Sequence, residues 1–503
     1  AGSYCIKIWC FCFPTDEMES NQKRKSSPNR TNATNCQAMS SNQETIVAIA
    51  SGTGGAIALI RISGPDAIAI ADRIFSGVSH KSLTQSKGFT LHYGYIRNEL
   101  GETIDDVILS LFKAPHSYTG EDMIEVTCHG STYIQQEILR LFIQNGARMA
   151  QGGEFTLRAY MAGKMDLSQA EAVADIIASD SKASLMLASR QIRGGYSEEF
   201  ALLRAQLLEL VSLLELELDF SEEDVEFADR SRLRAMLDDI QHKIETLSNS
   251  FQLGNILKNG VPVAIVGSPN VGKSTLLNAL LNEDRALVSD IAGTTRDLIE
   301  ETINIQGITF RFIDTAGIRD TADPLEHLGI ERTLQRLQQA AIVLFMVDVR
   351  ESFDTIAQQL TTYPPQQGQH TVVLLNKTDQ ANISQIKTLQ KQLAQQFGYR
   401  VLAISAKQHE NLSELTQVLY NCVEADTALR SGQIIVSNAR HHEALEAALA
   451  ATQRAQESLD NDLPGDLLAQ DIREVLHHLG TITGEITSQD VLNSIFSKFC
   501  IGK

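Results

Sequence analysis

The sequence predicts a multidomain protein: a small N-terminal α+β domain, an all-α helical domain, and a Ras-like α/β module with a phosphate-binding loop that is inserted into the helical domain. Three observations predict this fold class. The chain has 503 residues, more than a single hydrophobic core usually serves. Helical periodicity lies on both sides of an α/β segment. Within that segment a strand, a glycine-containing loop and a helix follow one another.

The expected domain boundaries follow the changes of pattern along the chain. We expect a disordered extension at 1–43, because residues 22–38 are polar and ordered periodicity begins only at Thr45. Its apolar run at 5–13 could mimic a targeting peptide, but we favour an upstream translated extension with Met39 as the natural start. We expect the α+β domain at 44–157, the two parts of the helical domain at 158–257 and 425–503, and the inserted module at 258–424.

The individual elements are predicted from the spacing of apolar residues. In the α+β domain we expect strands at 45–50, 56–62, 89–97, 105–112 and 123–128, with helices at 66–75 and 134–144. In the helical domain we expect long amphipathic helices at 170–179, 184–215 and 231–251, and again at 439–460, 466–479 and 488–499.

A phosphate-binding loop is predicted at residues 267–274, which read Gly-Ser-Pro-Asn-Val-Gly-Lys-Ser between the apolar run 261–266 and a helical segment at 275–282. The glycines let backbone N–H groups face a polyphosphate, Lys273 adds a positive charge, and the Ser274 hydroxyl is a ligand for Mg²⁺. An ordinary glycine turn would not need the flanking strand and helix. The expected nucleotide contacts are Asn270, Val271, Gly272, Lys273, Ser274 and Thr275.

Two later motifs predict that the base is guanine. Asp379 follows the apolar run 371–375 in the motif Asn-Lys-Thr-Asp, where its carboxylate can accept the two N–H donors of a guanine edge while Asn376 braces the loop. Adenine has no such pair of donors. Ser-Ala-Lys follows the next run, 401–404. In this order the motifs resemble the translation-factor-like GTPases, and the expected base contacts are Asn376, Lys377, Thr378, Asp379, Ser405, Ala406 and Lys407.

Two intervening loops are predicted to sense the terminal phosphate of GTP. In the first, Thr295 can bind Mg²⁺ together with Ser274. In the second, Asp314 lies near the Mg²⁺ and Gly317 near the phosphate. The expected contacts are Ser289, Asp290, Ile291, Ala292, Gly293, Thr294, Thr295, Asp314, Thr315, Ala316 and Gly317.

The residue that would orient the attacking water is missing from its usual place. Ile318 follows Gly317 where Ras-like proteins carry a glutamine. Because an apolar side chain cannot orient water, another group must do so. The polar candidates are Asn270, Arg296, Arg319 and Glu326, although the two arginines could equally be solvated loop residues.

Composition restricts the class of protein further. A net charge of −19 and a pI near 5.1 argue against a broad electrostatic grip on nucleic acid. The seven cysteines show no metal-finger spacing, which favours free thiols in a reducing compartment. No apolar run reaches the length of a membrane helix. We therefore expect a cytoplasmic protein.

Two further segments accompany the inserted module: Ala-Gly-Thr-Thr-Arg-Asp at 292–297 and Cys-Ile-Gly-Lys at the C-terminus. With them, the arrangement over residues 44–503 resembles the tRNA-modification GTPases called MnmE or TrmE. This resemblance implies a homodimer, formed through the N-terminal domain, that assembles with an FAD-containing partner of the MnmG (GidA) family into a heterotetramer. The pair adds a carboxymethylaminomethyl or aminomethyl group to C5 of the wobble uridine in certain tRNAs, using 5,10-methylene- or 5-formyl-tetrahydrofolate.

The resemblance also implies roles for particular residues. Folate binding is implied for Arg61, Glu125, Lys164 and Lys503, and K⁺ binding, which would activate hydrolysis, for Asn270, Ser289, Ile291 and Thr294. Glu326 matches the residue that positions water, and we count Arg319 as a second catalytic candidate. Cys500 matches the C-terminal cysteine for which a catalytic role is proposed; the alternative is a small buried side chain. One departure is residues 51–55, which are rich in glycine alone where the family has a loop rich in proline and glycine.

Two other classes remain as alternatives. A ribosome-assembly GTPase of the Era kind would carry a basic RNA-binding domain, and the flanks of this module are acidic. A non-enzymatic scaffold that senses guanine nucleotide would not need to respond to K⁺.

Overall fold

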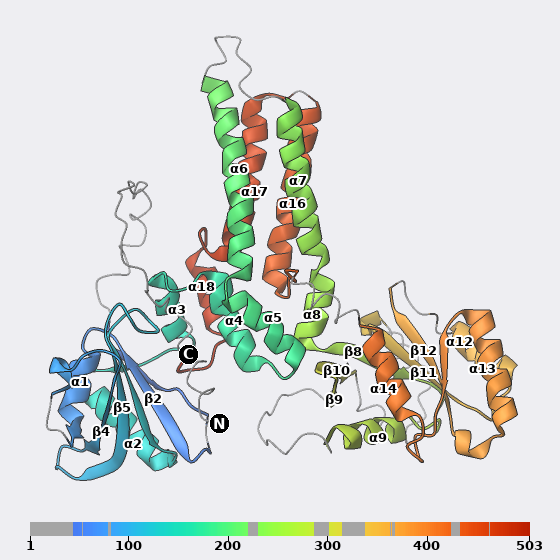
Figure 1. Ribbon diagram of the computed structural model, residues 1–503, viewed down its shortest axis with the longest axis horizontal. Coiled ribbons are helices and arrows are strands. Elements are labelled where there is room, and N and C mark those ends of the chain that lie inside the picture. The colour runs from blue at the N-terminus through green and yellow to red at the C-terminus, as the bar shows by residue number, and fades with distance from the viewer. Residues whose placement is uncertain are drawn as a thin grey trace, which may run out of the picture. The chain divides into compact units, whose positions relative to one another are not determined.

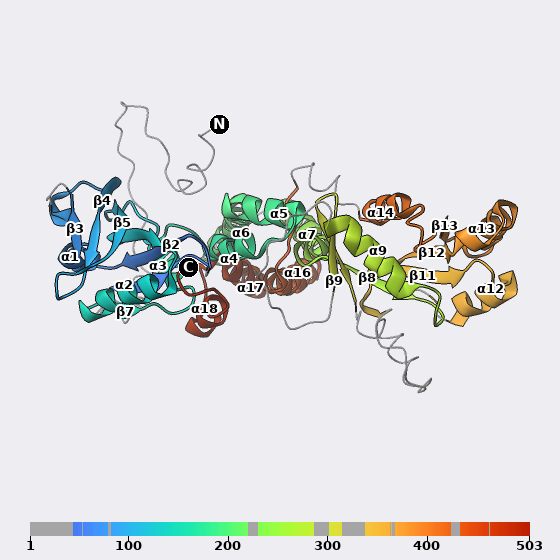
Figure 2. The same ribbon diagram turned by 90° about the horizontal axis from the view of Figure 1, so that it is seen from below.

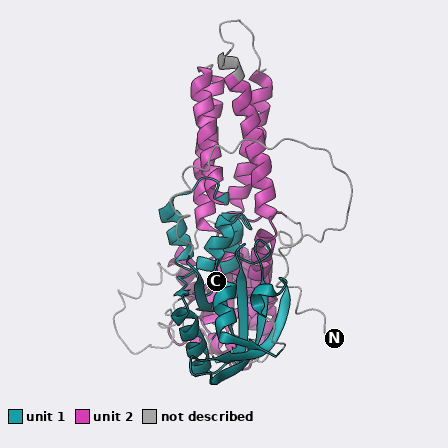
Figure 3. Cartoon of the chain, turned by 90° about the vertical axis from the view of Figure 1, so that its left-hand side faces the viewer, with its two compact units in different colours: residues 1–174, 483–503 teal, residues 175–482 magenta. Residues whose placement is uncertain are grey.

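The computed structural model describes residues 44–52, 54–78, 82–219, 230–285, 301–313, 338–362, 364, 368–423, 433–461 and 463–503, with backbone only at 216–219 and 283–285 (Figure 1). The chain forms two compact units, one of residues up to 174 together with 483–503, and one of residues 175–482 (Figure 3). Within the described part, no helix is both long enough and apolar enough to cross a bilayer.

The first unit is built on a seven-stranded sheet in its described residues, in the order β3-β4-β5-β6-β2-β1-β7. Neighbouring strands are antiparallel except β1 and β7. The strands are β1 (Ile46–Ile49), β2 (Ile57–Ser63), β3 (Phe75–Gly77), β4 (Thr90–Arg97), β5 (Thr103–Phe112), β6 (Met123–His129) and β7 (Arg148–Met149).

Helices cover the two faces of this sheet unequally. Helices α1 (Ala67–Ile74) and α2 (Thr132–Gln144) bury one face in a single apolar core. On the other face, α3 (Glu154–Met161) covers the β1 end, where Ile46 and Ala48 pack with Phe155. The five strands and two helices predicted for this region are confirmed to within two residues at each end, whereas β3, β7 and α3 were not predicted.

The C-terminal helix belongs to the same unit. Helix α18 (Gln489–Phe496) packs its apolar face on Leu167 and Ala170 of α4 (Leu167–Ala178) and on residues of α3. The Ser488 hydroxyl caps α18 by accepting the N–H of Val491. The predicted helix at 488–499 therefore exists but ends three residues earlier, at Phe496.

The second unit contains a bundle of four helices, α6 (Gly195–Asp219), α7 (Arg230–Asn249), α16 (Ala439–Asp460) and α17 (Gly465–Thr483), around a common apolar core. The prediction of one helix over 184–215 is wrong. The chain forms α5 (Lys182–Ile192) and then α6, because Gly194 has φ +86, which a right-handed helix cannot contain. Similarly, α8 (Phe251–Asn259) is a helix separate from α7.

The α/β module has a six-stranded sheet in its described residues, in the order β13-β12-β11-β8-β10-β9. All neighbours are parallel except β9 and β10. The strands are β8 (Val261–Val266), β9 (Glu301–Ile305), β10 (Ile308–Phe312), β11 (Ile342–Asp348), β12 (His370–Asn376) and β13 (Arg400–Ala403). The apolar runs at 261–266, 371–375 and 401–404, next to which the nucleotide motifs were predicted, form β8, β12 and β13 to within one residue at each end.

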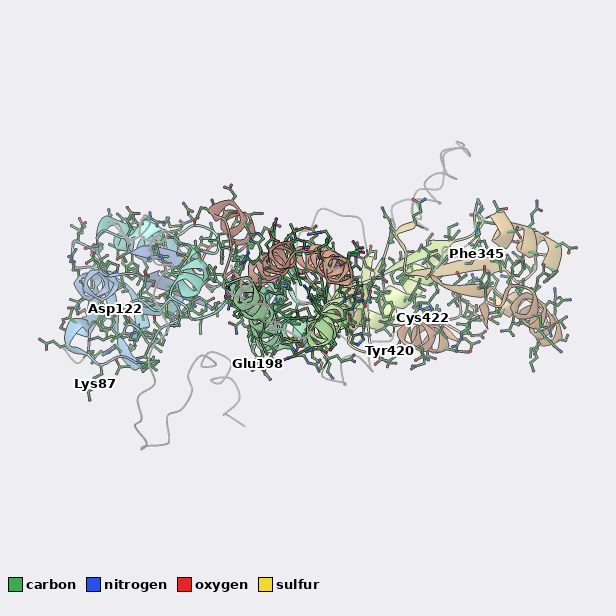
Figure 4. The ribbon with its side chains drawn as sticks, turned by 90° about the horizontal axis from the view of Figure 1, so that it is seen from above. Lys87, Asp122, Glu198, Phe345, Tyr420 and Cys422 are labelled. Atoms are coloured by element: carbon green, nitrogen blue, oxygen red, sulfur yellow. The ribbon has the colours of Figure 1, made fainter. Side chains whose placement is uncertain are left out.

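Helices α9 (Lys273–Arg285) and α14 (Leu412–Asn421) cover one face of this sheet, and α12 (Phe353–Thr362) and α13 (Ile383–Phe397) cover the other (Figures 1 and 2). Tyr420 and Cys422 pack against the core under α9 and α14, while Phe345 of β11 is buried in the core under α12 and α13 (Figure 4). Because β10, β8, β11, β12 and β13 are parallel, their carboxyl ends lie at one edge of the sheet. Ligands bind at this edge in sheets of this kind.

The module shares its core with two helices of the helical region. Ala183 and Leu187 of α5 and Leu257 of α8 belong to the same cluster as β8 and β10. Polar contacts reinforce this packing: Ala183 N donates to Gly307 O at 3.0 Å, and the Thr309 hydroxyl donates to Asp180 Oδ1 at 3.1 Å. Module and helical region are thus joined by a packed interface as well as by the chain.

Helix α8, which leads into the α/β module, crosses the segment around Val436, which leads out of it, at close range. A Cβ on Gly254 of α8 would lie 2.0 Å from Val436 O. We expect Gly254→Ala to lower the midpoint of thermal unfolding by at least about 2 °C, because overpacking costs roughly 1–3 kcal/mol. Gly195→Ala is the matched control, since its Cβ would meet only Arg190 O at 3.4 Å. Equal midpoints of thermal unfolding for both variants and the wild type would contradict the close contact between Gly254 and Val436.

Candidate functional site

The phosphate-binding loop lies between the end of β8 and the start of α9, and close contacts require its two glycines. A Cβ on Gly267 would lie 2.1 Å from Met346 O, and one on Gly272, whose φ is +108, would lie 2.5 Å from Asn376 Nδ2. The ammonium of Lys273 lies within the loop, donating to Gly267 O at 2.7 Å and to Ser268 O at 3.0 Å. Backbone donors at a helix N-terminus and a lysine fit a polyphosphate.

Asn376 at the end of β12 joins this loop to the 405–407 loop. Its side-chain Nδ2 donates to Val271 O at 2.8 Å, and its Oδ1 accepts the N–H of Ala406 at 3.0 Å. The side chain is buried, so both hydrogen bonds are shielded from water. We call this set of contacts the Asn376 bridge (Asn376, Val271 and Ala406).

Asp379 presents its carboxylate to solvent beside the Asn376 bridge. Ser405 Oγ donates to Asp379 Oδ1 at 2.7 Å, and this hydrogen bond, with a smaller contribution from the charge of Lys407, lowers the pKa of Asp379. The carboxylate is therefore a charged acceptor at neutral pH. An exposed, ionised acceptor held by one hydroxyl can receive two N–H donors from a planar base.

Part of the predicted nucleotide site falls outside the residues that the structure describes. Ser274 lies in the first turn of α9 and Asn270 in the loop before it, with φ +60. The remaining predicted contacts of the terminal phosphate and the metal ions lie outside the described residues: Ser289, Asp290, Ile291, Ala292, Gly293, Thr294, Thr295, Asp314, Thr315, Ala316, Gly317, Arg319 and Glu326. Of the residues predicted to bind Mg²⁺ and those predicted to bind K⁺, the structure thus describes one each, Ser274 and Asn270.

A second site lies in the first unit, around an ion pair between β2 and β6. Arg61 Nε and Nη2 each lie 2.9 Å from Glu125 Oε1, because the two residues are direct partners in the sheet register. Both residues are about 95% buried, with 4% and 5% of their surface exposed. The rings of Tyr118 and Phe155 lie 5.3 and 5.6 Å from the Arg61 guanidinium carbon and add cation–π contacts.

The C-terminal tail completes this second site. Arg61 Nη1 donates to Gly502 O at 3.2 Å, and Phe155 N donates to Lys503 O at 3.2 Å. Gly502 has φ +98, and a Cβ there would lie 2.4 Å from Ile49 O, so the tail needs glycine at this position. Burial, and secondly the charge of Arg61, lower the pKa of Lys503.

The other two predicted residues of this region lie at its margin. Lys164 approaches the loop that carries Tyr118, since its Cε is 3.4 Å from where a Cβ on Gly120 would lie. Cys500 is exposed, so the alternative of a buried structural side chain is wrong. Its carbonyl oxygen accepts the N–H of Gly153 at 3.4 Å, which fixes the tail beside α3.

Several residues of the two sites were missed by sequence reasoning. Tyr118, Phe155 and Gly502 form the walls around Arg61, and no motif marks the first two. Asp348 ends a fully buried strand at the same edge as the phosphate loop, and that pattern is visible in the sequence as an apolar run followed by an acid.

Comparison with known families gives two matches that together span most of the chain. Residues 45–164 match the model described as "GTP-binding protein TrmE N-terminus". Residues 167–500 match the model described as "MnmE helical domain".

Curated relatives agree with these matches. Proteins named "tRNA modification GTPase MnmE" are 55% identical over 470 residues in Bacteroides fragilis and 49% identical over 470 residues in Flavobacterium johnsoniae. Each alignment covers 92% of this chain and 100% of the relative. Among solved structures, the FeoB G-domain from Methanococcus jannaschii is 25% identical, covering 33% of this chain and 98% of its own, with a TM-score of 0.24.

Proposed function

The chain belongs to the MnmE (TrmE) family of tRNA modification GTPases, and from this premise we propose that it is a K⁺-activated GTPase that modifies the wobble uridine. With an FAD-containing partner it adds a carboxymethylaminomethyl or aminomethyl group to C5 of that uridine in the cytoplasm. The observation that carries the proposal is the Asn376 bridge, which places the exposed carboxylate of Asp379 beside a phosphate loop.

The described residues divide the work of nucleotide binding. Asp379 accepts the guanine N–H donors, with Ser405, Ala406 and Lys407 bordering the base. The phosphate loop and Lys273 bind the phosphates. The hydrogen bonds of the Lys273 ammonium to the loop carbonyls hold its positive charge within the loop, where the phosphates would lie. Ser274, together with Thr295 outside the described residues, would hold Mg²⁺, which would neutralise charge on the phosphates.

The K⁺ site is proposed at Asn270, Ser289, Ile291 and Thr294, where a monovalent cation supplies positive charge to the transferring phosphate. Two observations support it. Ile318 occupies the position of the usual glutamine, so charge and water must be handled by other groups. Asn270 lies in the phosphate loop, where Lys377 binds its main-chain carbonyl; within the described residues its side chain makes no hydrogen bond, so it fits the role of a ligand. Glu326 and Arg319 are the proposed residues for positioning water and stabilising charge.

The second site is proposed to bind tetrahydrofolate as its 5,10-methylene or 5-formyl derivative. A pterin offers N–H donors to a carboxylate, and its glutamate tail is anionic. Glu125 fits the pterin because Arg61 binds only its Oε1; within the described residues Oε2 has no hydrogen bond. Lys503 and Lys164 fit the acidic tail. Cys500 is exposed near this site, and we propose it as a catalytic residue.

A homodimer is proposed through the uncovered face of the N-terminal sheet. Leu91 and Tyr93 of β4 and Ile108 of β5 point away from the helix-covered core and are 73%, 54% and 46% exposed. Tyr93 and Ile108 are direct cross-strand partners, so they form one apolar patch. An apolar sheet face of this kind is typical of a protein interface. The dimer with two copies of the FAD-containing partner gives the proposed heterotetramer that acts on tRNA.

Cation dependence tests the proposed hydrolysis. GTP turnover should be at least about tenfold faster in K⁺ than in Na⁺ at equal ionic strength, because an equivalent charge from an arginine is worth roughly 10³–10⁵. Asn270→Gly should lose most of this difference while still binding GDP, since glycine accepts the left-handed backbone. Equal turnover in the two salts by the wild-type protein would rule out the cation site.

Folate binding tests the second site independently of hydrolysis. We expect Glu125→Gln to weaken binding of 5-formyl-tetrahydrofolate about tenfold or more, because a hydrogen bond to a charged group is lost. Lys503→Ala should also weaken binding while leaving the Arg61–Glu125 pair intact. Glu99→Gln, an exposed glutamate of the same unit, serves as the control. Calorimetric titration that gave one affinity for all four proteins would remove folate from this pocket.

A further inference from the structure

Asp348, the last residue of β11, collects donors from two cations at the edge of the nucleotide site. Its carboxylate accepts the backbone N–H of Arg350 at 3.0 Å, Arg350 Nε at 2.9 Å and Arg350 Nη2 at 2.6 Å. The ammonium of Lys377 lies 2.8 Å from its Oδ2. Only 11% of the Asp348 side chain is exposed. These hydrogen bonds, that of Arg350 first, hold the pKa of Asp348 well below its usual range, so the group is an anion at any working pH.

The same ammonium reaches the phosphate loop. Lys377 Nζ donates to Asn270 O at 2.9 Å, so one nitrogen bonds both Asp348 and the loop apex. Lys377 and Asn270 are both non-glycine residues in the left-handed region, with φ values of 66 and 60. Left-handed backbone is tolerated by asparagine but is unfavourable for lysine, so the conformation of Lys377 must be held by its surroundings.

We propose that Asp348 is a positioning residue of the nucleotide site, which acts through Lys377 to hold the apex of the phosphate loop at Asn270. The two carboxylate contacts fix where the Lys377 ammonium lies, and the ammonium fixes the Asn270 carbonyl. Lys377 is thereby held beside Asp379, two residues further along the base motif. The inference rests on the proposed guanine-nucleotide site but not on the proposed cation.

This arrangement adds a second connection between base motif and phosphate loop. The Asn376 bridge holds Val271 O, and the Asp348–Lys377 pair holds the neighbouring Asn270 O. A lysine alone would leave the apex poorly defined, because a flexible four-carbon stem carries a strongly hydrated ammonium. Lys377 is 24% exposed, so water competes for it when the carboxylate is absent. Nucleotide should then leave faster, because the loop is no longer held in its binding conformation.

The test is a double-mutant cycle on nucleotide release. The full-length proteins Asp348→Asn, Lys377→Met and the double variant are loaded with a fluorescent GDP analogue, and the release rate is measured after adding excess GDP. We expect each single variant to release about tenfold faster than wild type, and the double variant to match Lys377→Met, because residues that act as one unit are not additive. Glu351→Gln is the matched control: it removes one charge from the same loop, and its side chain contacts Gln359 instead.

The outcomes distinguish failure of the positioning role of Asp348 from failure of the proposed nucleotide site. A wild-type release rate for Asp348→Asn would overturn the positioning role, and so would additive effects in the double variant, since Asp348 would then act by a route other than Lys377. A lower midpoint of thermal unfolding for Asp348→Asn, without faster release of the GDP analogue, would show a purely structural role. That result would also overturn the positioning role. If the wild-type protein does not bind the GDP analogue at all, the proposed nucleotide site itself fails.

Discussion

The Asn376 bridge is the contact on which the nucleotide site depends. Parallel strands bring the phosphate loop, the base motif and the 405–407 loop to one edge of the sheet, but a shared edge alone does not fix their relative positions. One buried amide does so by donating to Val271 O and accepting from Ala406 N. A buried polar group of this kind is stable only when its partners are present, so the three loops are held as one body.

The second site depends on a different constraint: the C-terminal tail must lie next to strand β2 of the N-terminal sheet. Arg61 and Gly502 are 441 positions apart, yet they share a hydrogen bond. The helical region and the α/β module are both contained between these two residues. The tail is accepted because Gly502 avoids the Ile49 carbonyl and because Arg61 is already neutralised by Glu125. An insertion is therefore compatible with a site built from segments that lie far apart in the chain.

Much of the fold could be predicted from the sequence, because apolar periodicity and turn residues act locally. The strands of the N-terminal sheet and those of the α/β module follow such patterns. The break at Gly194 was missed, since a single glycine within a helical pattern is often tolerated and its backbone conformation depends on packing. Lys273 and Asp379 could be assigned from motifs that carry their own chemistry. Tyr118 and Phe155 could not, because their role comes only from standing next to Arg61 in three dimensions. The position of Asp348 is marked in the sequence by an apolar run followed by an acid, but its role is not, because its partner Lys377 follows the neighbouring strand.

We propose that one edge of this sheet recognises guanine through Asp379. This recognition is tested most directly by competition of GDP and ADP against a fluorescent GDP analogue bound to the purified full-length protein. ADP should compete at least about a hundredfold more weakly than GDP, because adenine lacks the pair of N–H donors that the carboxylate requires. Equal competition by the two nucleotides would contradict the account.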